Sequence, residues 1–207
     1  MLTYEPRNVI RLIPILTSLV LSSCQTPSRP QAPLNSERIE AKFGSYGIEV
    51  LESNPIRISN LYSTHGGKKI CRTFAVVEFS KDIPSGLARP LSEILAGASL
   101  GATLKTAWWK ITKHHLYLDE IASGKRFRTL AHLPANFAGE LAVRIYQLNV
   151  SKEGPEIAFA TIAEVHHPEY LTIDDLKPFA VGSTTPNTKE QKRIDQLLAT
   201  AYTELAN

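Results

Sequence analysis

Charged side chains inside apolar strand patterns are the residues of this 207-residue chain best suited to chemistry. Arg144 stands between Val143 and Ile145, and Tyr146 shares its parity in the same run. A buried, unpaired charge costs several kcal/mol, so such a group needs a partner across the sheet or must line a polar pocket. The residues that we predict to bind a ligand, or else to pair structurally, are Arg72, Arg144, Tyr146 and Glu164.

The pentapeptide Gly97-Ala98-Ser99-Leu100-Gly101 has the pattern G-x-S-x-G. In α/β-hydrolases this pattern lifts a nucleophilic serine above a sheet, provided that a strand precedes it and a helix follows. His166 would then serve as the base. The apolar residues before Gly97 recur at helical spacing instead, which favours a packing role for the small residues. A serine hydrolase using Ser99 is therefore the alternative hypothesis, and a non-enzymatic domain is favoured.

The histidines and the cysteine of the expected domain do not predict a metal or cofactor site. His114-His115 and His166-His167 are neighbours in expected strands, where adjacent side chains point to opposite faces of a sheet. Neither pair can supply two ligands to one metal ion. Cys71 lies in the apolar run from Ile70 to Phe79, where a cysteine usually acts as a small buried hydrophobe. We expect no metal and no cofactor.

Strands are the main elements that must position these side chains. Strand patterns cover residues 46–51, 56–62, 69–80, 110–118, 141–150 and 157–165, and helical patterns cover 36–43, 84–107 with a break near Gly97, and the end of the chain from Thr188. The stretch 69–80 is apolar on both parities, which indicates a central strand. This order predicts an α+β fold: an antiparallel sheet of about five to six strands, helices packed on one side and a C-terminal amphipathic helix.

The first 23 residues have the pattern of a secretory signal. Arg7 and Arg11 precede a mostly apolar run from Leu12 to Leu21, which is shorter than the roughly 20 residues of a membrane-spanning helix. The sequence Leu21-Ser22-Ser23-Cys24 resembles the lipobox of bacterial lipoprotein precursors. The resemblance implies cleavage before Cys24 and lipid attachment to that cysteine. Because Gln25 follows, it also implies an outer-membrane location facing the periplasm.

Composition limits the partners of the mature chain. Residues 24–35 are rich in proline and polar residues, so we expect a flexible tether before a single globular domain at 36–207. Without Arg7, Arg11 and Glu5 the chain has 21 basic and 19 acidic residues, a net charge of +2, which does not indicate nucleic acid binding. Basic residues concentrate between 105 and 128. We expect them to form a solvated face, with attraction to anionic lipid head groups or an acidic polymer as the alternative.

The order of elements from about Ile56 to Leu171 carries a second resemblance. A hairpin and a helix are followed by Ser99-Leu100, a segment ending at Trp109-Lys110-Ile111-Thr112, and a final strand pair closing on Glu164 to Tyr170. This order resembles the chorismate lyase-like fold, which also forms the effector-binding (UTRA-type) domain of GntR-type repressors. The resemblance implies a fold that binds small molecules. We therefore predict a membrane-anchored domain that binds a small ligand or an envelope protein.

Overall fold

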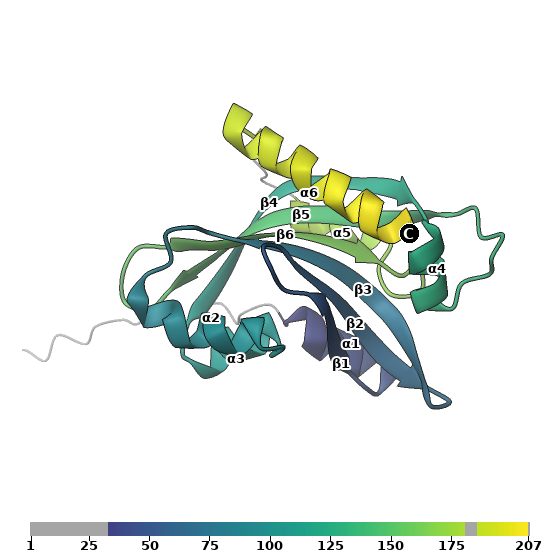
Figure 1. Cartoon of the computed structure of the whole chain (residues 1–207), viewed down its shortest axis with the longest axis horizontal. Helices are drawn as coiled ribbons and strands as arrows, with labels where there is room; N and C mark the ends of the chain where they lie inside the picture. The colour runs from purple at the N-terminus through teal and green to yellow at the C-terminus, as the bar shows by residue number, and fades with distance from the viewer. Residues whose placement is uncertain (1–32, 181–185, 207) are drawn as a thin grey trace, which may run out of the picture. The chain divides into compact units, whose positions relative to one another are not determined.

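One antiparallel sheet with the strand order β1-β2-β3-β6-β5-β4 organises the computed structural model of the chain (Figure 1). The structure describes residues 33–180 and 186–206. The signal segment, Cys24 and most of the expected tether lie outside the described residues. The strands are β1 (Gly47–Glu52), β2 (Arg57–His65), β3 (Lys68–Phe79), β4 (Lys110–Ala122), β5 (Glu140–Ser151) and β6 (Ile157–His166).

The α+β class and the antiparallel sheet are confirmed, and each expected strand is present within a few residues of its predicted bounds. β3 lies in the middle of the sheet beside β6, as its two apolar parities indicate. The β2–β3 hairpin turns at Gly66 and Gly67, whose φ angles of 56° and 77° suit glycine.

Helices cover both faces of the sheet, whereas the sequence predicted helices on one side. On one face lie α4 (Lys125–Ala131) and the C-terminal helix α6 (Thr188–Ala206); on the other lie α1 (Asn35–Phe43), α2 (Ala88–Leu95) and α3 (Leu100–Thr106), as Figure 1 shows. The physical reason is that β3, β5 and β6 carry apolar side chains on both parities, so both faces of the central strands need a cover. Gly97, with φ 114°, separates α2 from α3.

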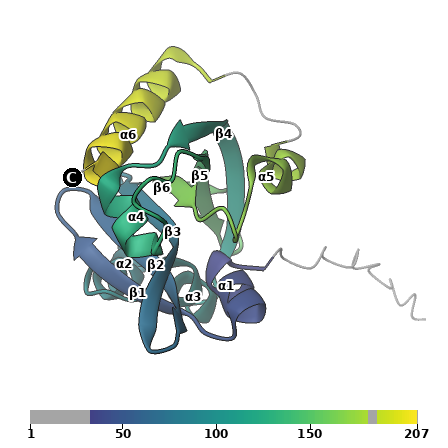
Figure 2. The same ribbon diagram turned by 90° about the vertical axis from the view of Figure 1, so that its right-hand side faces the viewer.

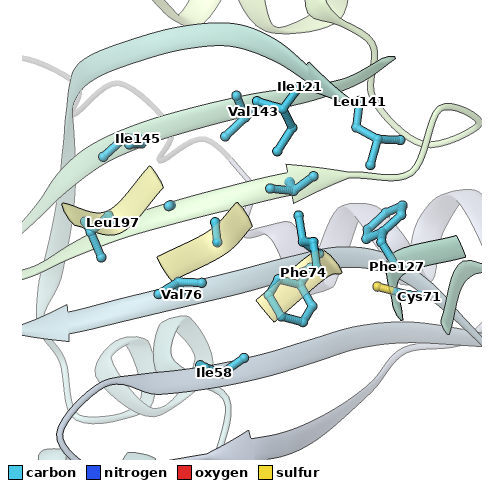
Figure 3. Close-up of a cluster of buried hydrophobic side chains, with 14 of the residues drawn as sticks. Ile58, Cys71, Phe74, Val76, Ile121, Phe127, Leu141, Val143, Ile145 and Leu197 are labelled. Atoms are coloured by element: carbon cyan, nitrogen blue, oxygen red, sulfur yellow. The ribbon is translucent and has the colours of Figure 1, made fainter. Parts of the chain in front are cut away.

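The larger apolar core lies under α4 and α6. Ile194, Leu197, Ala201 and Leu205 form the buried stripe of α6, and they pack on alternate side chains of the central strands (Figure 3). Asn187 caps α6 by accepting hydrogen bonds from the backbone N–H groups of Lys189 and Glu190.

Two short helices were not expected. The basic helix α4 carries Phe127 and Ala131 into the core, and α5 (Ile173–Ala180) contacts β4 and β5, where Figure 2 shows it beside β4. The fold also begins earlier than predicted. Leu34 and Asn35, which the sequence placed in the tether, are each 7% exposed and belong to the packed structure.

Candidate functional site

Arg144 and Glu164 form a buried ion pair at the centre of the candidate site. The β5–β6 register places them directly opposite each other. Arg144 donates from Nε and Nη2 to Glu164 Oε2 at 2.8 and 2.6 Å. Both residues are almost fully buried, with 1% and 4% exposure. Arg144 and Glu164 therefore pair with each other within the protein, which is the structural alternative that the sequence left open, and the pair has the short, charge-assisted geometry of a strong interaction.

The second carboxylate oxygen of Glu164 is also satisfied by the protein. The Tyr146 hydroxyl donates to Oε1 at 3.1 Å, and Asn35 Nδ2 donates to the same atom at 3.2 Å. Burial alone would raise the pKa of Glu164, but the positive charges of Arg144 and Lys113 outweigh it and hold that pKa below its ordinary value. Glu164 is therefore ionised at neutral pH, and its low pKa makes it a poor base.

A small cavity lies beside Glu164 on the face covered by α1 and α3. Its volume is about 70 Å³, and residues from all six strands line it, always from one parity of a strand that contributes twice. The apolar wall consists of side chains such as Leu61, Val77, Leu148 and Ile162. The polar lining includes Tyr46, Arg57, Ser99, Lys113 and Glu164. A mostly apolar lining with a few converging polar groups is the composition of a small-molecule site, and the small volume limits the ligand to a few heavy atoms.

Arg57 lines this cavity with a hydrogen-bond donor that has no acceptor among the described residues. Its side chain lies on β2 and the residue is 2% exposed. Nη2 donates to the backbone oxygen of Ala98 at 3.0 Å, but Nε has no hydrogen-bond partner among the described residues. Burial lowers the pKa of Arg57, and no carboxylate within the described structure forms an ion pair with it. A buried guanidinium of this kind lacks the anion that usually offsets its lost hydration.

Lys113 adds a second cation to the cavity lining. Its ammonium lies 4.6 Å from the centroid of the Tyr146 ring. Burial lowers the pKa of Lys113 to about 8, because Glu164 only partly offsets the desolvation. Arg57, Lys113 and Arg144 thus place three positive charges around the single negative charge of Glu164.

The neighbouring histidines do not change this balance. Burial, reinforced by Arg144, lowers the pKa of His115 to about 4 and that of His166 to about 3. Both rings are neutral at pH 7. Arg38 also acts electrostatically on Lys113, Tyr146 and His166, so the cavity and its immediate surroundings carry an excess of positive charge and attract anions.

Three of the four predicted binding residues come together, and the fourth does not. Arg144, Tyr146 and Glu164 form one network, and Tyr146 and Glu164 also line the cavity. Arg72 does not line it. Its guanidinium bonds Ser63 at 2.8 Å and Glu169 at 3.0 Å, and it lies 3.7 Å from the centroid of the Phe43 ring.

Ser99 and His166, the residues of the hydrolase alternative, are not arranged as a nucleophile and its base. Ser99 precedes α3 and follows α2, so no strand leads into the G-x-S-x-G segment. The Tyr46 hydroxyl donates to Ser99 Oγ at 3.4 Å. His166 instead contacts Thr73 Oγ1 through Nδ1 at 3.1 Å. Ser99 therefore contributes a hydroxyl to the cavity wall.

Arg57 and Lys113 are the site residues that the sequence did not single out. Arg57 stands between Ile56 and Ile58, the same pattern that identified Arg144, so a uniform search for charges within strands finds it. Lys113 was assigned to the solvated basic segment. Lys113 lines the cavity only because α1 and α3 cover that part of the sheet, and no local sequence pattern indicates this cover.

The sequence was compared with family models and with curated proteins. No family model matches the sequence, and no curated protein is significantly similar to it. Within residues 33–180 and 186–206, no cluster of histidine, cysteine or acidic side chains is arranged to hold a metal ion. In the same part of the chain, no helix is long and apolar enough to cross a membrane.

Proposed function

We propose that the domain binds a small organic anion in the cavity between the sheet and helices α1 and α3, without chemical conversion. The unpartnered Nε of buried Arg57 is the observation that carries the proposal. An anionic group beside it would complete its hydrogen bonding and draw on the charge of Lys113. The apolar wall of Leu61, Val77 and Leu148 suits a short hydrocarbon portion of the same ligand. The sequence resemblance to the chorismate lyase-like fold remains a prediction alongside this proposal.

Titration with straight-chain carboxylates tests this proposal. The full chain is titrated calorimetrically with acetate, propionate, butyrate and hexanoate at pH 7. We expect affinity to rise about fourfold per added CH2, equivalent to about 0.8 kcal/mol, until the cavity is full, and then to fall. Butylammonium, which has the same chain and the opposite charge, is the matched control and should not bind. Equal heats for butyrate and butylammonium, or no binding of any carboxylate, would contradict the proposal.

The affinity for butyrate should depend on pH through Lys113. Lys113 is protonated below its pKa of about 8, so its attraction for a carboxylate is fully present at pH 6–7 and is lost as the pH rises through 8. Butyrate, with a carboxyl pKa near the value of about 4.3 for glutamate, stays ionised throughout. We expect the dissociation constant to rise by up to tenfold per pH unit above pH 8. Lys113→Gln should bind more weakly at pH 7 and show no such rise; an unchanged pH profile would remove Lys113 from the site.

We also propose that the chain is a lipoprotein anchored through Cys24, facing the periplasm from the outer membrane. The lipobox resemblance of Leu21 to Cys24 and the preceding apolar run support this proposal. Serine offers no thiolate for a thioether bond, so Cys24→Ser should prevent lipid attachment and release the protein from the membrane fraction. Fractionation of cells, with mass measurement of the mature chain, checks the result. Unchanged maturation and retention of Cys24→Ser would contradict the proposal.

A further inference from the structure

Trp108 is exposed to solvent in a backbone conformation that tryptophan rarely adopts. It lies between α3 and β4 with φ 61° and 85% exposure. The other exposed large hydrophobic side chains of the described residues, Leu95, Phe179 and Tyr202, are 38–47% exposed. The left-handed conformation belongs to the end of α3: the backbone N–H groups of Trp108 and Trp109 donate to the carbonyl oxygens of Lys105 and Leu104, each at 3.0 Å. This cap accounts for the backbone but does not bury the ring, so the indole remains available to a partner outside the domain.

Two lysines without acidic partners lie at the end of the β4–β5 ladder that is next to Trp108 in the chain. Lys110, at the start of β4, pairs with Ser151 at the end of β5, and Lys152 directly follows Ser151. Neither lysine forms an ion pair within the described part of the chain, although Glu153 follows Lys152 in sequence. Lys152 lies 4.8 Å from the centroid of the Trp109 ring. We call Trp108, Trp109, Lys110 and Lys152 the tryptophan patch.

A groove adjoins the tryptophan patch and has an unused hydrogen-bond donor. Its volume is about 320 Å³, and Trp109, Lys152 and Arg89 are among the residues that line it. Trp109 Nε1 is buried and has no hydrogen-bond partner among the described residues. Arg89 pairs with Glu93 at 2.9 Å, which leaves Lys152 as the uncompensated charge of the groove. An indole N–H and an ammonium together suit a phosphate oxygen as acceptor.

We propose that the tryptophan patch binds the surface of an anionic phospholipid membrane, with the Trp108 ring at head-group level. Tryptophan favours this level because its ring is apolar and its N–H is polar. Each lysine near an anionic surface strengthens the binding about fivefold. A protein partner is less well matched, because a stable interface buries about 800 Å² on each side and only one indole protrudes here.

The start of the described chain lies near the tryptophan patch. Leu34 packs against Gly101 in α3, and α3 leads from there to Trp108 over roughly 10 Å. The lipid affinity of the patch does not depend on the proposed anchoring at Cys24.

Fluorescence of single-tryptophan variants tests the inference independently of the anchor. The full chain carrying Cys24→Ser and Trp109→Phe retains Trp108 as its one tryptophan. With vesicles of phosphatidylglycerol and phosphatidylcholine, we expect a blue shift of Trp108 emission and quenching by brominated acyl chains, and with phosphatidylcholine alone a much smaller effect. The apolar segment 12–21 is present in every variant, so the readout is the environment of Trp108 and not sedimentation.

Charge reversal supplies the matched control. Adding Lys110→Glu and Lys152→Glu should weaken the fluorescence response at least tenfold, because two attractive charges become repulsive. Lys125→Glu with Lys189→Glu makes the same charge change on α4 and α6 and should leave the response unchanged. Butyrate titration of the first pair should be unaltered, which separates this inference from the cavity. The inference is overturned if anionic vesicles do not change the Trp108 emission, or if the two pairs of substitutions weaken the fluorescence response equally. It is also overturned if the protein shows the same shift on self-association without vesicles.

Discussion

Arg144→Met is expected to lower the free energy of unfolding by about 3–5 kcal/mol. The substitution removes both guanidinium bonds to Glu164 Oε2 and leaves a carboxylate that is 4% exposed without its counter-ion. Glu164→Gln should destabilise similarly, because it leaves the Arg144 charge buried and unpaired. Denaturant unfolding measures both values, with the slope of the transition as a check that the denatured state is unchanged.

The double variant Arg144→Met with Glu164→Gln separates an ion pair from two independent losses. It should recover part of the summed destabilisation, because the remaining amide oxygen still accepts from Tyr146 and Asn35. Arg89→Met is the matched control: its partner Glu93 is surface-exposed, so we expect a change of less than about 1 kcal/mol. Additive single-variant effects, with no coupling energy, would show that the pair does not act as a unit.

Arg57→Met is expected to reduce butyrate affinity about tenfold to a hundredfold without lowering stability. Hydrogen bonds between charged groups contribute about 1.5–3 kcal/mol, which corresponds to this loss in binding. In the unliganded protein Arg57 has an unpartnered Nε and no ion pair, so an apolar side chain of similar length should leave the free energy of unfolding unchanged or raise it by about 1 kcal/mol.

The two substitutions should differ in what they lower: Arg57→Met lowers butyrate affinity, as expected for a binding residue, and Arg144→Met lowers stability, as expected for a structural one. Both guanidinium groups are buried, with 2% and 1% exposure, but only Arg144 has a carboxylate of the protein as its partner. Calorimetric titration and denaturant unfolding are measured on both variants. A large loss of stability in Arg57→Met, with butyrate affinity retained in the part that folds, would make Arg57 structural and contradict its assignment to the site.

The sheet was predictable because its signals are local. Alternating apolar residues and the turns at Gly66-Gly67 and Lys152 to Pro155 define the strands and the hairpins, and the hairpin register brings Arg144 opposite Glu164. The helices α4 and α5 were missed because each has only seven or eight residues, too few for an apolar period to show beside the charged residues.

The cavity was not predictable, because it is produced by packing between segments far apart in sequence. Asn35 follows a proline-rich stretch and resembles a tether residue, yet its side chain bonds Glu164 across 129 positions of the chain. Gly101 is small enough for Leu34 to pack against α3 and seal the same face. Arg57 carries a usable local signal, whereas the role of Lys113 depends on this tertiary cover.

The cavity assignment is tested most directly by crystals of the full chain grown with 4-bromobutyrate, in which anomalous scattering locates the bromine. We expect a bromine atom in the cavity beside Leu61, Val77 and Leu148, with the carboxylate within hydrogen-bond distance of Arg57 Nε, and no such site in crystals of Arg57→Met. Bromine bound only outside the cavity, or a carboxylate that leaves Arg57 Nε without a partner, would contradict the assignment of this protein as a small-anion binder.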